Sequence, residues 1–146
     1  MVAKTAAGLV IFRRCTNMVQ YLLLQTSYGE HHWTPPKGHV DPGETDEMVT
    51  ALRETEEESG LVESDLKIYK DSKRILNYSV RGSPKTVIYW LAELINSNAR
   101  VKLSEEHQDY KWLELEEACT FGNYSDMQEM LKYFDNFIKT KLPSNL

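Results

Sequence analysis

The sequence predicts an α/β fold in which a mixed sheet lies between helices. Apolar, β-branched runs recur along the chain as expected for strands, and two amphipathic segments with apolar side chains at spacings of three and four predict helices. Strands interleaved with helices in this way indicate a sheet covered on both faces. At 146 residues, the chain is expected to fold as one domain spanning residues 1–146.

Two strands are expected at the start of the chain, over residues 6–12 and 19–25. The polar link between them contains Thr16 and Asn17, which favours a turn and therefore a pair of neighbouring strands. Residues 27–36 are expected to form an irregular loop, because they contain a glycine and a pair of prolines.

The first helix is expected over residues 46–59. Met48, Ala51, Leu52 and Thr55 share one face at helical spacing, and Gly60 is a natural stop signal. Further strands are expected at residues 66–69, 74–80, 85–94 and 109–113, with a hairpin connection at 81–84 and a helical turn at 115–119.

The second helix occupies the C-terminal part of the sequence. Ser125, with Gln128 three residues later, matches the pattern of a capping box, and Pro143 marks the end of the helix. Apolar side chains recur on one face and are expected to pack in the core; they are Met127, Met130, Leu131, Phe134, Phe137 and Ile138.

The composition disfavours several kinds of partner. The net charge of -5 argues against binding to a nucleic-acid backbone or an anionic membrane surface, and no apolar stretch reaches the length of about 18 residues that spans a bilayer. Cys15 and Cys119 lie far apart and form no metal-binding or redox motif, as in a reduced intracellular protein. The cytoplasm is the expected location, with the nucleus as a second one, and a monomer is expected.

The expected first helix carries an unusual concentration of carboxylates. Glu54, Glu57 and Glu58 fall within about 100° of its surface, although like charges at these spacings cost an isolated helix a few tenths of a kcal/mol per pair. One interpretation is a solvated acidic surface. The other is a platform for a hard divalent cation such as Mg²⁺ or Mn²⁺, steadied by an ion pair from Arg53 to Glu57.

The order of residues around this helix resembles the Nudix box, which would span residues 38–61. The motif runs from a glycine through a glutamate and an Arg-Glu pair to a Glu-Glu pair and a final glycine followed by a bulky apolar residue. The matching positions are Gly38, Glu44, Arg53, Glu54, Glu57, Glu58, Gly60 and Leu61. Two differences stand out: Thr55 replaces a bulky apolar residue, and one extra residue separates Glu44 from Arg53, which enlarges the turn before the helix.

Beyond the box, the chain resembles the animal-type asymmetrical diadenosine tetraphosphate hydrolases over nearly its whole length. The matching segments are HHWTPPKGHVDPGE at 31–44, NY at 77–78, PKTVIYWLAEL at 84–94 and LSEEHQDYKWLELEEA at 103–118. The resemblance implies an α/β/α Nudix sandwich with a mixed sheet. It also implies an enzyme that uses Mg²⁺, with Mn²⁺ as a substitute, to split diadenosine tetraphosphate, a small dinucleoside polyphosphate, into ATP and AMP by attack of water on a phosphorus.

The resemblance assigns chemistry to individual carboxylates. The bridging phosphates of the substrate carry several negative charges, so the reaction needs cations that neutralise charge on phosphoryl oxygens. Glu54, Glu57 and Glu58 are the implied metal ligands, with Glu57 binding either directly or through water. Glu54, Glu58 and Glu106 are the implied catalytic residues, and either Glu106 or Glu54 takes the proton of the attacking water.

Basic groups near the box are implied in binding the phosphates. Each of them alone would be an ordinary surface residue, but their placement matches that of the family. The residues expected to contact phosphate oxygens are His32, Lys37, His39 and Lys85.

Aromatic residues are implied in binding the bases. Tyr78 and Tyr124 are expected to flank an adenine, because stacking on an aromatic ring contributes about 1 to 3 kcal/mol per base. Tyr89 either reaches a phosphate with its hydroxyl or packs within a strand. The tryptophans are expected in the core; they are Trp33, Trp90 and Trp112.

Two other functions are compatible with the same motif. Another Nudix pyrophosphatase would act on a modified nucleoside triphosphate, a cap structure or an inositol polyphosphate, because the box itself does not select the substrate. A catalytically silent Nudix domain would bind nucleotides or proteins, although the intact set of carboxylates argues against it.

Overall fold

The computed structural model describes residues 4–80 and 82–142, without the side chains of Tyr78 and Val80. Its strands are β1 (Lys4–Cys15), β2 (Met18–Thr26), β3 (Trp33–Thr34), β4 (Lys37–His39), β5 (Leu66–Val80), β6 (Ser83–Leu94) and β7 (His107–Leu113). Its α-helices are α1 (Glu47–Ser59), α2 (Leu115–Gly122) and α3 (Ser125–Lys141), and a short 3-10 helix, η1, covers Glu63–Asp65.

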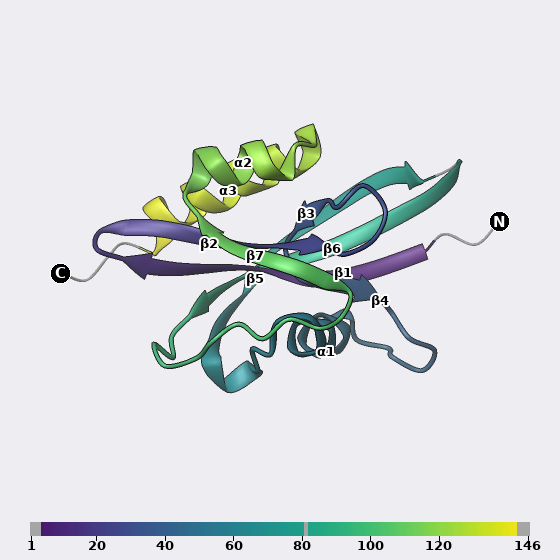
Figure 1. The fold of residues 1–146 in the computed structure, drawn as a ribbon, viewed down its shortest axis with the longest axis horizontal. Helices are drawn as coiled ribbons and strands as arrows, with labels where there is room; N and C mark the ends of the chain where they lie inside the picture. The colour runs from purple at the N-terminus through teal and green to yellow at the C-terminus, as the bar shows by residue number, and fades with distance from the viewer. Residues whose placement is uncertain (1–3, 81, 143–146) are drawn as a thin grey trace.

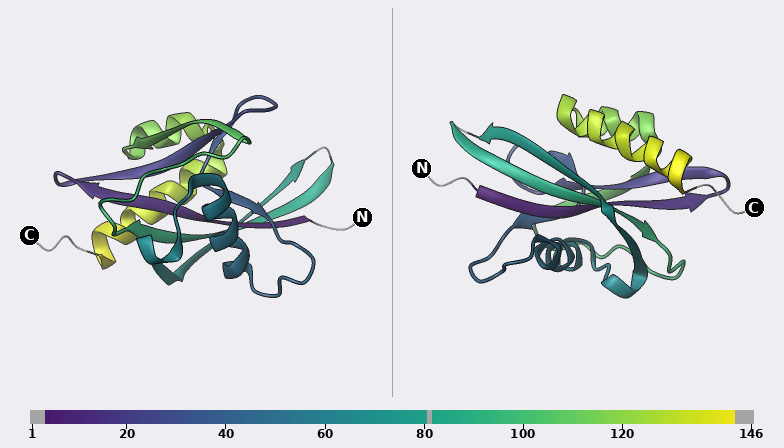
Figure 2. Two further views of the ribbon diagram at one scale, coloured as in Figure 1. Left: turned by 60° about the horizontal axis from the view of Figure 1, so that its bottom comes forward. Right: turned by 180° about the vertical axis from the view of Figure 1, so that it is seen from behind.

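The described strands form one mixed sheet between helices. The main strand order is β3-β2-β1-β6-β5, with β4 paired to β1 and β7 paired to β2. Strands β1 and β6 are parallel, whereas β1 and β2 are antiparallel. Figures 1 and 2 show α2 and α3 on one face of the sheet and α1 on the other, so the expected sandwich is confirmed.

The chain begins with the expected hairpin. Strands β1 and β2 extend beyond the apolar runs predicted at 6–12 and 19–25. Cys15 pairs with Met18 across a tight turn. Thr16 and Asn17 form that turn with φ angles of 49° and 65°. Positive φ at both central residues matches the right-handed twist of paired strands, which explains why the polar link is so short.

Each face of the sheet has its own apolar core. Side chains such as Phe12, Leu23 and Leu91 pack against α2 and α3, and Leu9, Leu22 and Trp90 pack against α1. Every apolar side chain expected on the inner face of α3 is buried. Trp90 is a core residue as expected, whereas Trp33 and Trp112 are partly buried at the margins of the two cores.

The structure corrects the predicted start of the C-terminal helix. Tyr124, rather than Ser125, is the N-cap residue, and no side chain caps that end. The Gln128 side chain instead donates to the backbone carbonyl of Cys119, at 3.0 Å, which ties α3 to α2. The predicted capping box is therefore wrong, because the Gln128 side chain that it requires is hydrogen-bonded to α2 instead. The predicted stop at Pro143 lies outside the described residues.

Other differences are smaller. The strands expected at 66–69 and 74–80 are one strand, β5, with an irregular register between Tyr69 and Arg74. There the Ser72 hydroxyl accepts from the backbone N–H of Leu91, at 2.8 Å, and so maintains the pairing with β6. The loop at 27–36 includes β3, and the turn expected at 115–119 is helix α2. Among the described residues, no helix is both long and apolar enough to cross a membrane.

Candidate active site

Helix α1 is held so that one side of it faces strand β4. Asp46 caps the helix by accepting from the backbone N–H of Met48, at 2.9 Å, and Gly60 ends it with φ of 78°. Ala51 and Thr55 are fully buried against the sheet, so the residue that replaces an apolar side chain in the motif is still used for packing. Both helix boundaries agree with the sequence prediction.

The carboxylates of α1 therefore lie in different environments. Glu58 is only 7% exposed. Its Oε1 accepts from the backbone N–H of Lys37 on β4, at 3.1 Å. Glu54 is partly buried beside it, whereas the side chain of Glu57 is 55% exposed. The three expected metal ligands thus divide into two that face β4 and one that faces solvent.

Two glycines allow these segments to approach closely. A Cβ at Gly38 would lie 1.4 Å from Oε2 of Glu54, so only a glycine leaves room for that carboxylate. A Cβ at Gly8 would lie 2.2 Å from the carbonyl oxygen of Pro36. The glycine therefore lets the start of β4 lie close against β1. The position of Gly38 at the start of the motif thus has a steric explanation.

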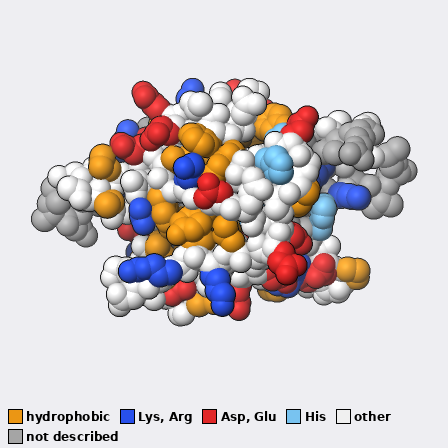
Figure 3. All heavy atoms as spheres, in the orientation of Figure 1, with side chains coloured by type: hydrophobic (Ala, Val, Ile, Leu, Met, Phe, Trp, Pro, Cys, Tyr) orange, Lys and Arg blue, Asp and Glu red, His pale blue; other side chains and the backbone are white. Residues whose placement is uncertain are grey.

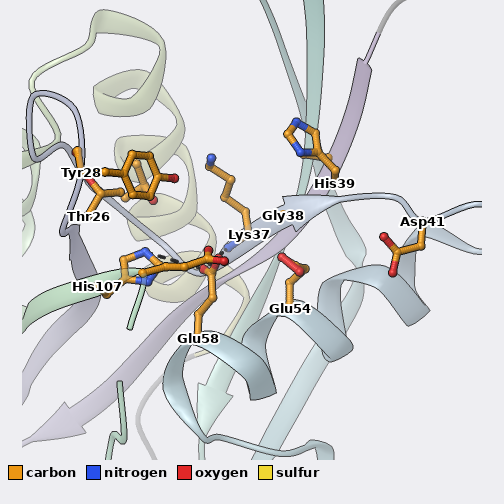
Figure 4. Close-up of a pocket in the computed structure, with 12 residues that line it drawn as sticks. Thr26, Tyr28, Lys37, Gly38, His39, Asp41, Glu54, Glu58 and His107 are labelled. Atoms are coloured by element: carbon orange, nitrogen blue, oxygen red, sulfur yellow. Dashed lines mark hydrogen bonds and ion pairs between the residues drawn. The ribbon is translucent and has the colours of Figure 1, made fainter. Parts of the chain in front are cut away.

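A pocket of about 270 Å³ opens above this contact. Figure 4 shows Glu54 and Glu58 rising from α1 toward Lys37 and Gly38, with His107 beside Glu58. In Figure 3, acidic side chains gather over the region of α1, with histidine side chains nearby. Of the expected catalytic and phosphate-binding residues, the pocket brings together Glu54, Glu58, Glu106, Lys37 and His39.

Arg53 organises the acidic segment. Its guanidinium donates to both carboxylate oxygens of Glu44, at 2.8 and 3.0 Å, to Glu54 at 2.9 Å and to the carbonyl oxygen of His39 at 3.0 Å. The expected ion pair with Glu57 is also present, at 3.2 Å. Despite the extra residue before Arg53, Glu44 still reaches the arginine with both oxygens.

The electrostatics of the pocket favour a cation. Burial raises the pKa of Glu58 to about 8, and burial together with the neighbouring Glu57 raises the pKa of Glu54 to about 7. By contrast, hydrogen bonds from Arg53 hold the pKa of Glu44 at about 2. A positive charge placed in the pocket would stabilise the ionised forms of Glu54 and Glu58.

The donor set of the pocket fits a hard divalent ion. Its carboxylate oxygens are the ligands that Mg²⁺ prefers. Among the described residues, no group of three or more His, Cys, Asp or Glu side chains is arranged to hold a metal by itself. Mg²⁺ commonly binds through one or two carboxylates, completed by water and substrate phosphates, so Glu54 and Glu58 are a suitable protein contribution.

Basic residues lie at and beside the pocket: Lys37 and His39 line it, whereas Lys85 is a neighbour of Lys37 outside the lining. Burial and the neighbouring Lys37 lower the pKa of Lys85 to about 8. Burial and the nearby Lys85 also lower the pKa of His39. His39 additionally lines a second cavity of about 440 Å³, together with Lys4. The positive charge here comes from Lys37 in the pocket and from Lys4 and Lys85 beside it, and an anionic chain could follow it from the carboxylates.

The aromatic residues divide between surface and core. The rings of His32 and Tyr124 lie with centroids 5.4 Å apart, and the Tyr124 hydroxyl is 3.2 Å from Nε2 of His32. Tyr124 is 52% exposed, which leaves its ring accessible. Tyr89 is buried in the core, the structural alternative expected for it. Tyr78 lies on β5, but its side chain is outside the described part.

Sequence reasoning missed several residues of the pocket. Thr26, Tyr28, Asp41 and His107 also line it. Thr26 and His107 face each other because β2 pairs with β7. Burial and the nearby carboxylates raise the pKa of Tyr28, and burial lowers the pKa of His107. The only signal for His107 was its position next to Glu106 in a segment already assigned to the site.

Comparison with known proteins agrees with this geometry. A family model described as NUDIX domain matches residues 3–134. The asymmetrical bis(5'-nucleosyl)-tetraphosphatase of Mus musculus is 51% identical over 142 residues, which cover 93% of this chain and 96% of that protein. The enzyme of the same name from Caenorhabditis elegans is 51% identical over 138 residues, which cover 94% of this chain and 98% of that protein.

A solved structure gives the same result. The binary complex of a C. elegans Ap4A hydrolase is 49% identical and superposes with a TM-score of 0.90 over 93% of this chain and 98% of that one. The chain therefore belongs to the Nudix family and, within it, to the asymmetrical bis(5'-nucleosyl)-tetraphosphatases.

Proposed function

We propose that this protein hydrolyses diadenosine tetraphosphate to ATP and AMP with the help of Mg²⁺, for which Mn²⁺ can substitute. The observation that carries the proposal is the pairing of two carboxylates, Glu54 and Glu58, in one pocket with a margin of basic residues. This arrangement suits a substrate that brings several phosphates and a cation at once. The names of the relatives support the choice of substrate.

Glu54 and Glu58 would hold the cation. When bound, a divalent cation neutralises charge on the phosphoryl oxygens and polarises the phosphorus toward attack. Arg53 keeps Glu54 in place through the 2.9 Å contact, and the backbone N–H of Lys37 does the same for Glu58. Glu57, which faces solvent and pairs with Arg53, would act through water rather than directly.

Glu106 would take the proton of the attacking water. It lines the pocket and is exposed, so a water molecule can reach it from solvent. Glu54 is the alternative base, but the guanidinium of Arg53 already occupies its Oε1 at 2.9 Å. In the reaction, the water oxygen bonds to a phosphorus, the bridging P–O bond breaks, and the water proton passes to the carboxylate.

The remaining residues would bind the substrate. Lys37, His39 and Lys85 would contact phosphate oxygens along the basic margin of the pocket. Tyr124 would stack on one adenine, with His32 beside it contacting a phosphate oxygen, and Tyr78 would flank a base. The Tyr89 side chain is buried, so its contribution would be to support the strand that carries Lys85.

Product analysis tests the proposal. Incubation with diadenosine tetraphosphate and Mg²⁺ should give ATP and AMP in equal amounts, and a chelator should stop the reaction. Two molecules of ADP, or much faster turnover of a capped RNA, a modified nucleoside triphosphate or an inositol polyphosphate, would contradict it. Glu58→Gln is the matched control, because it keeps the shape of the side chain but removes its charge.

The proposal includes a monomer in the cytoplasm or nucleus, which sedimentation and imaging of a tagged protein would check.

A further inference from the structure

The two oxygens of the Glu58 carboxylate have different surroundings. Oε1 accepts from the backbone N–H of Lys37 at 3.1 Å, and it also lies 3.9 Å from Nε2 of His107. Both contacts fall on the same oxygen and approach it from different strands, β4 and β7. They constrain the plane of the carboxylate without using Oε2.

His107 is an unusual neighbour for this carboxylate. Its side chain is 4% exposed and lines the pocket together with Glu58 and Glu106. Its Nδ1 is buried and, among the described residues, has no hydrogen-bond partner. A buried polar atom without a partner is costly, so a histidine kept here for packing alone would be a poor choice compared with an apolar side chain.

The missing partner at Nδ1 indicates which nitrogen carries the proton. A neutral imidazole has one N–H and one bare nitrogen. With the hydrogen on Nε2, the ring donates toward Glu58 and leaves a bare acceptor at Nδ1. With the hydrogen on Nδ1, a buried donor would be unpaired and the Nε2 lone pair would face the carboxylate. The first arrangement is therefore favoured.

We propose that His107 is a positioning residue for Glu58, which it holds by donating from Nε2 to Oε1 so that Oε2 is directed at the cation. The inference rests on the proposed function, because it assumes that Glu58 binds a divalent ion. The present distance of 3.9 Å exceeds that of a hydrogen bond, and an approach of about 1 Å would form one. Partners that orient the ligands of a metal typically change its affinity by about 10- to 100-fold.

Metal binding without substrate tests this inference separately from catalysis. Free Mn²⁺ is measured by electron paramagnetic resonance in titrations of the wild type, His107→Leu and His107→Gln. The leucine lacks a donor, and the amide of glutamine can place an N–H near the position of Nε2. We expect the leucine variant to bind Mn²⁺ about 10-fold more weakly or worse and to lose a similar factor in kcat. The glutamine variant should stay within about threefold of the wild type.

Several results would overturn the inference. One is Mn²⁺ binding by His107→Leu within twofold of the wild type; another is an equal loss in both variants, which indicates a merely structural role. Glu58→Gln is titrated in parallel. If it binds Mn²⁺ as tightly as the wild type, or if the wild type does not bind, the proposed function fails as well. If Glu58→Gln loses binding and His107→Leu does not, only the role of His107 fails.

A measurement on the unmodified protein covers the case in which the variants do not fold. Nitrogen-15 NMR of the imidazole rings distinguishes the two neutral tautomers. The hydrogen of His107 should reside on Nε2. A ring with its hydrogen on Nδ1 would exclude donation to Glu58 and would overturn the inference.

Discussion

Substitution of Gly38 by alanine should separate activity from stability. The added Cβ would lie 1.4 Å from Oε2, 2.0 Å from Cδ and 2.6 Å from Cγ of Glu54. Ordinary van der Waals contact requires about 3.5 Å, so the carboxylate must move by roughly 2 Å. The clash is with the end of a flexible side chain, and the backbone can stay in place.

The expected consequence is a large loss of activity in a folded protein. A displacement of about 1 Å at a catalytic group can cost 100-fold in rate, so we expect kcat of Gly38→Ala to fall by at least about 100-fold. That factor corresponds to about 2.7 kcal/mol of activation free energy. The free energy of unfolding should change by about 1 kcal/mol or less, because the clash involves only the end of a flexible side chain.

Steady-state kinetics and urea denaturation measure the two quantities. Gly8→Ala is the matched control, since its Cβ would meet the backbone oxygen of Pro36 at 2.2 Å and cannot be relieved by a side-chain movement. It should therefore reduce stability markedly. Wild-type kcat in Gly38→Ala, or a loss of stability as large as in Gly8→Ala, would refute the steric reasoning.

Three further predictions concern separate parts of the molecule. Because Arg53 lowers the pKa of Glu44 from 4.5 to about 2, the stabilisation by Glu44 is complete above about pH 4.5 and lost as the pH falls toward 2. Glu44→Gln should therefore be less stable than the wild type at pH 7, and the difference in denaturation midpoint should shrink over that acidic range; a constant difference would contradict this. Tyr21→Phe removes a buried 2.7 Å hydrogen bond to Asp135 and should lower the free energy of unfolding, measured by urea denaturation, by about 2 kcal/mol. The kcat measured by steady-state kinetics should not change; a decrease in kcat would mean that this contact also supports the site. Tyr124→Ala should raise KM for diadenosine tetraphosphate by about 5- to 100-fold. Tyr124→Phe keeps the ring, so its KM should stay near the wild-type value. Equal KM values for the two variants would argue against stacking.

Local patterns predicted most of the fold. The helix at 46–59, the hairpin around Thr16 and Asn17 and the buried face of the last helix all depend on spacing between near neighbours, which the sequence displays directly. The capping box at Ser125 failed because Gln128 has a better partner in α2, a contact between elements that no local pattern contains. The continuity of β5 was hidden for a similar reason, since it depends on a bond from β6 to Ser72.

The candidate site was predictable only where a motif covers it. Glu54, Glu58 and Glu106 lie in recognisable segments and meet in one pocket. Thr26 and His107 enter the same pocket through the pairing of β2 with β7, which joins segments about eighty residues apart. Such pairing depends on the three-dimensional register of strands and leaves no periodic signal in either segment.

The position of the metal tests the role of the acidic helix most directly. Crystals of the protein with Mn²⁺ and a non-hydrolysable analogue of diadenosine tetraphosphate would locate the ion by its anomalous scattering. An ion in the 270 Å³ pocket, in contact with the carboxylates of both Glu54 and Glu58, is the predicted result. An ion bound elsewhere, with neither carboxylate in contact with it, would contradict the assignment of α1 as the metal platform.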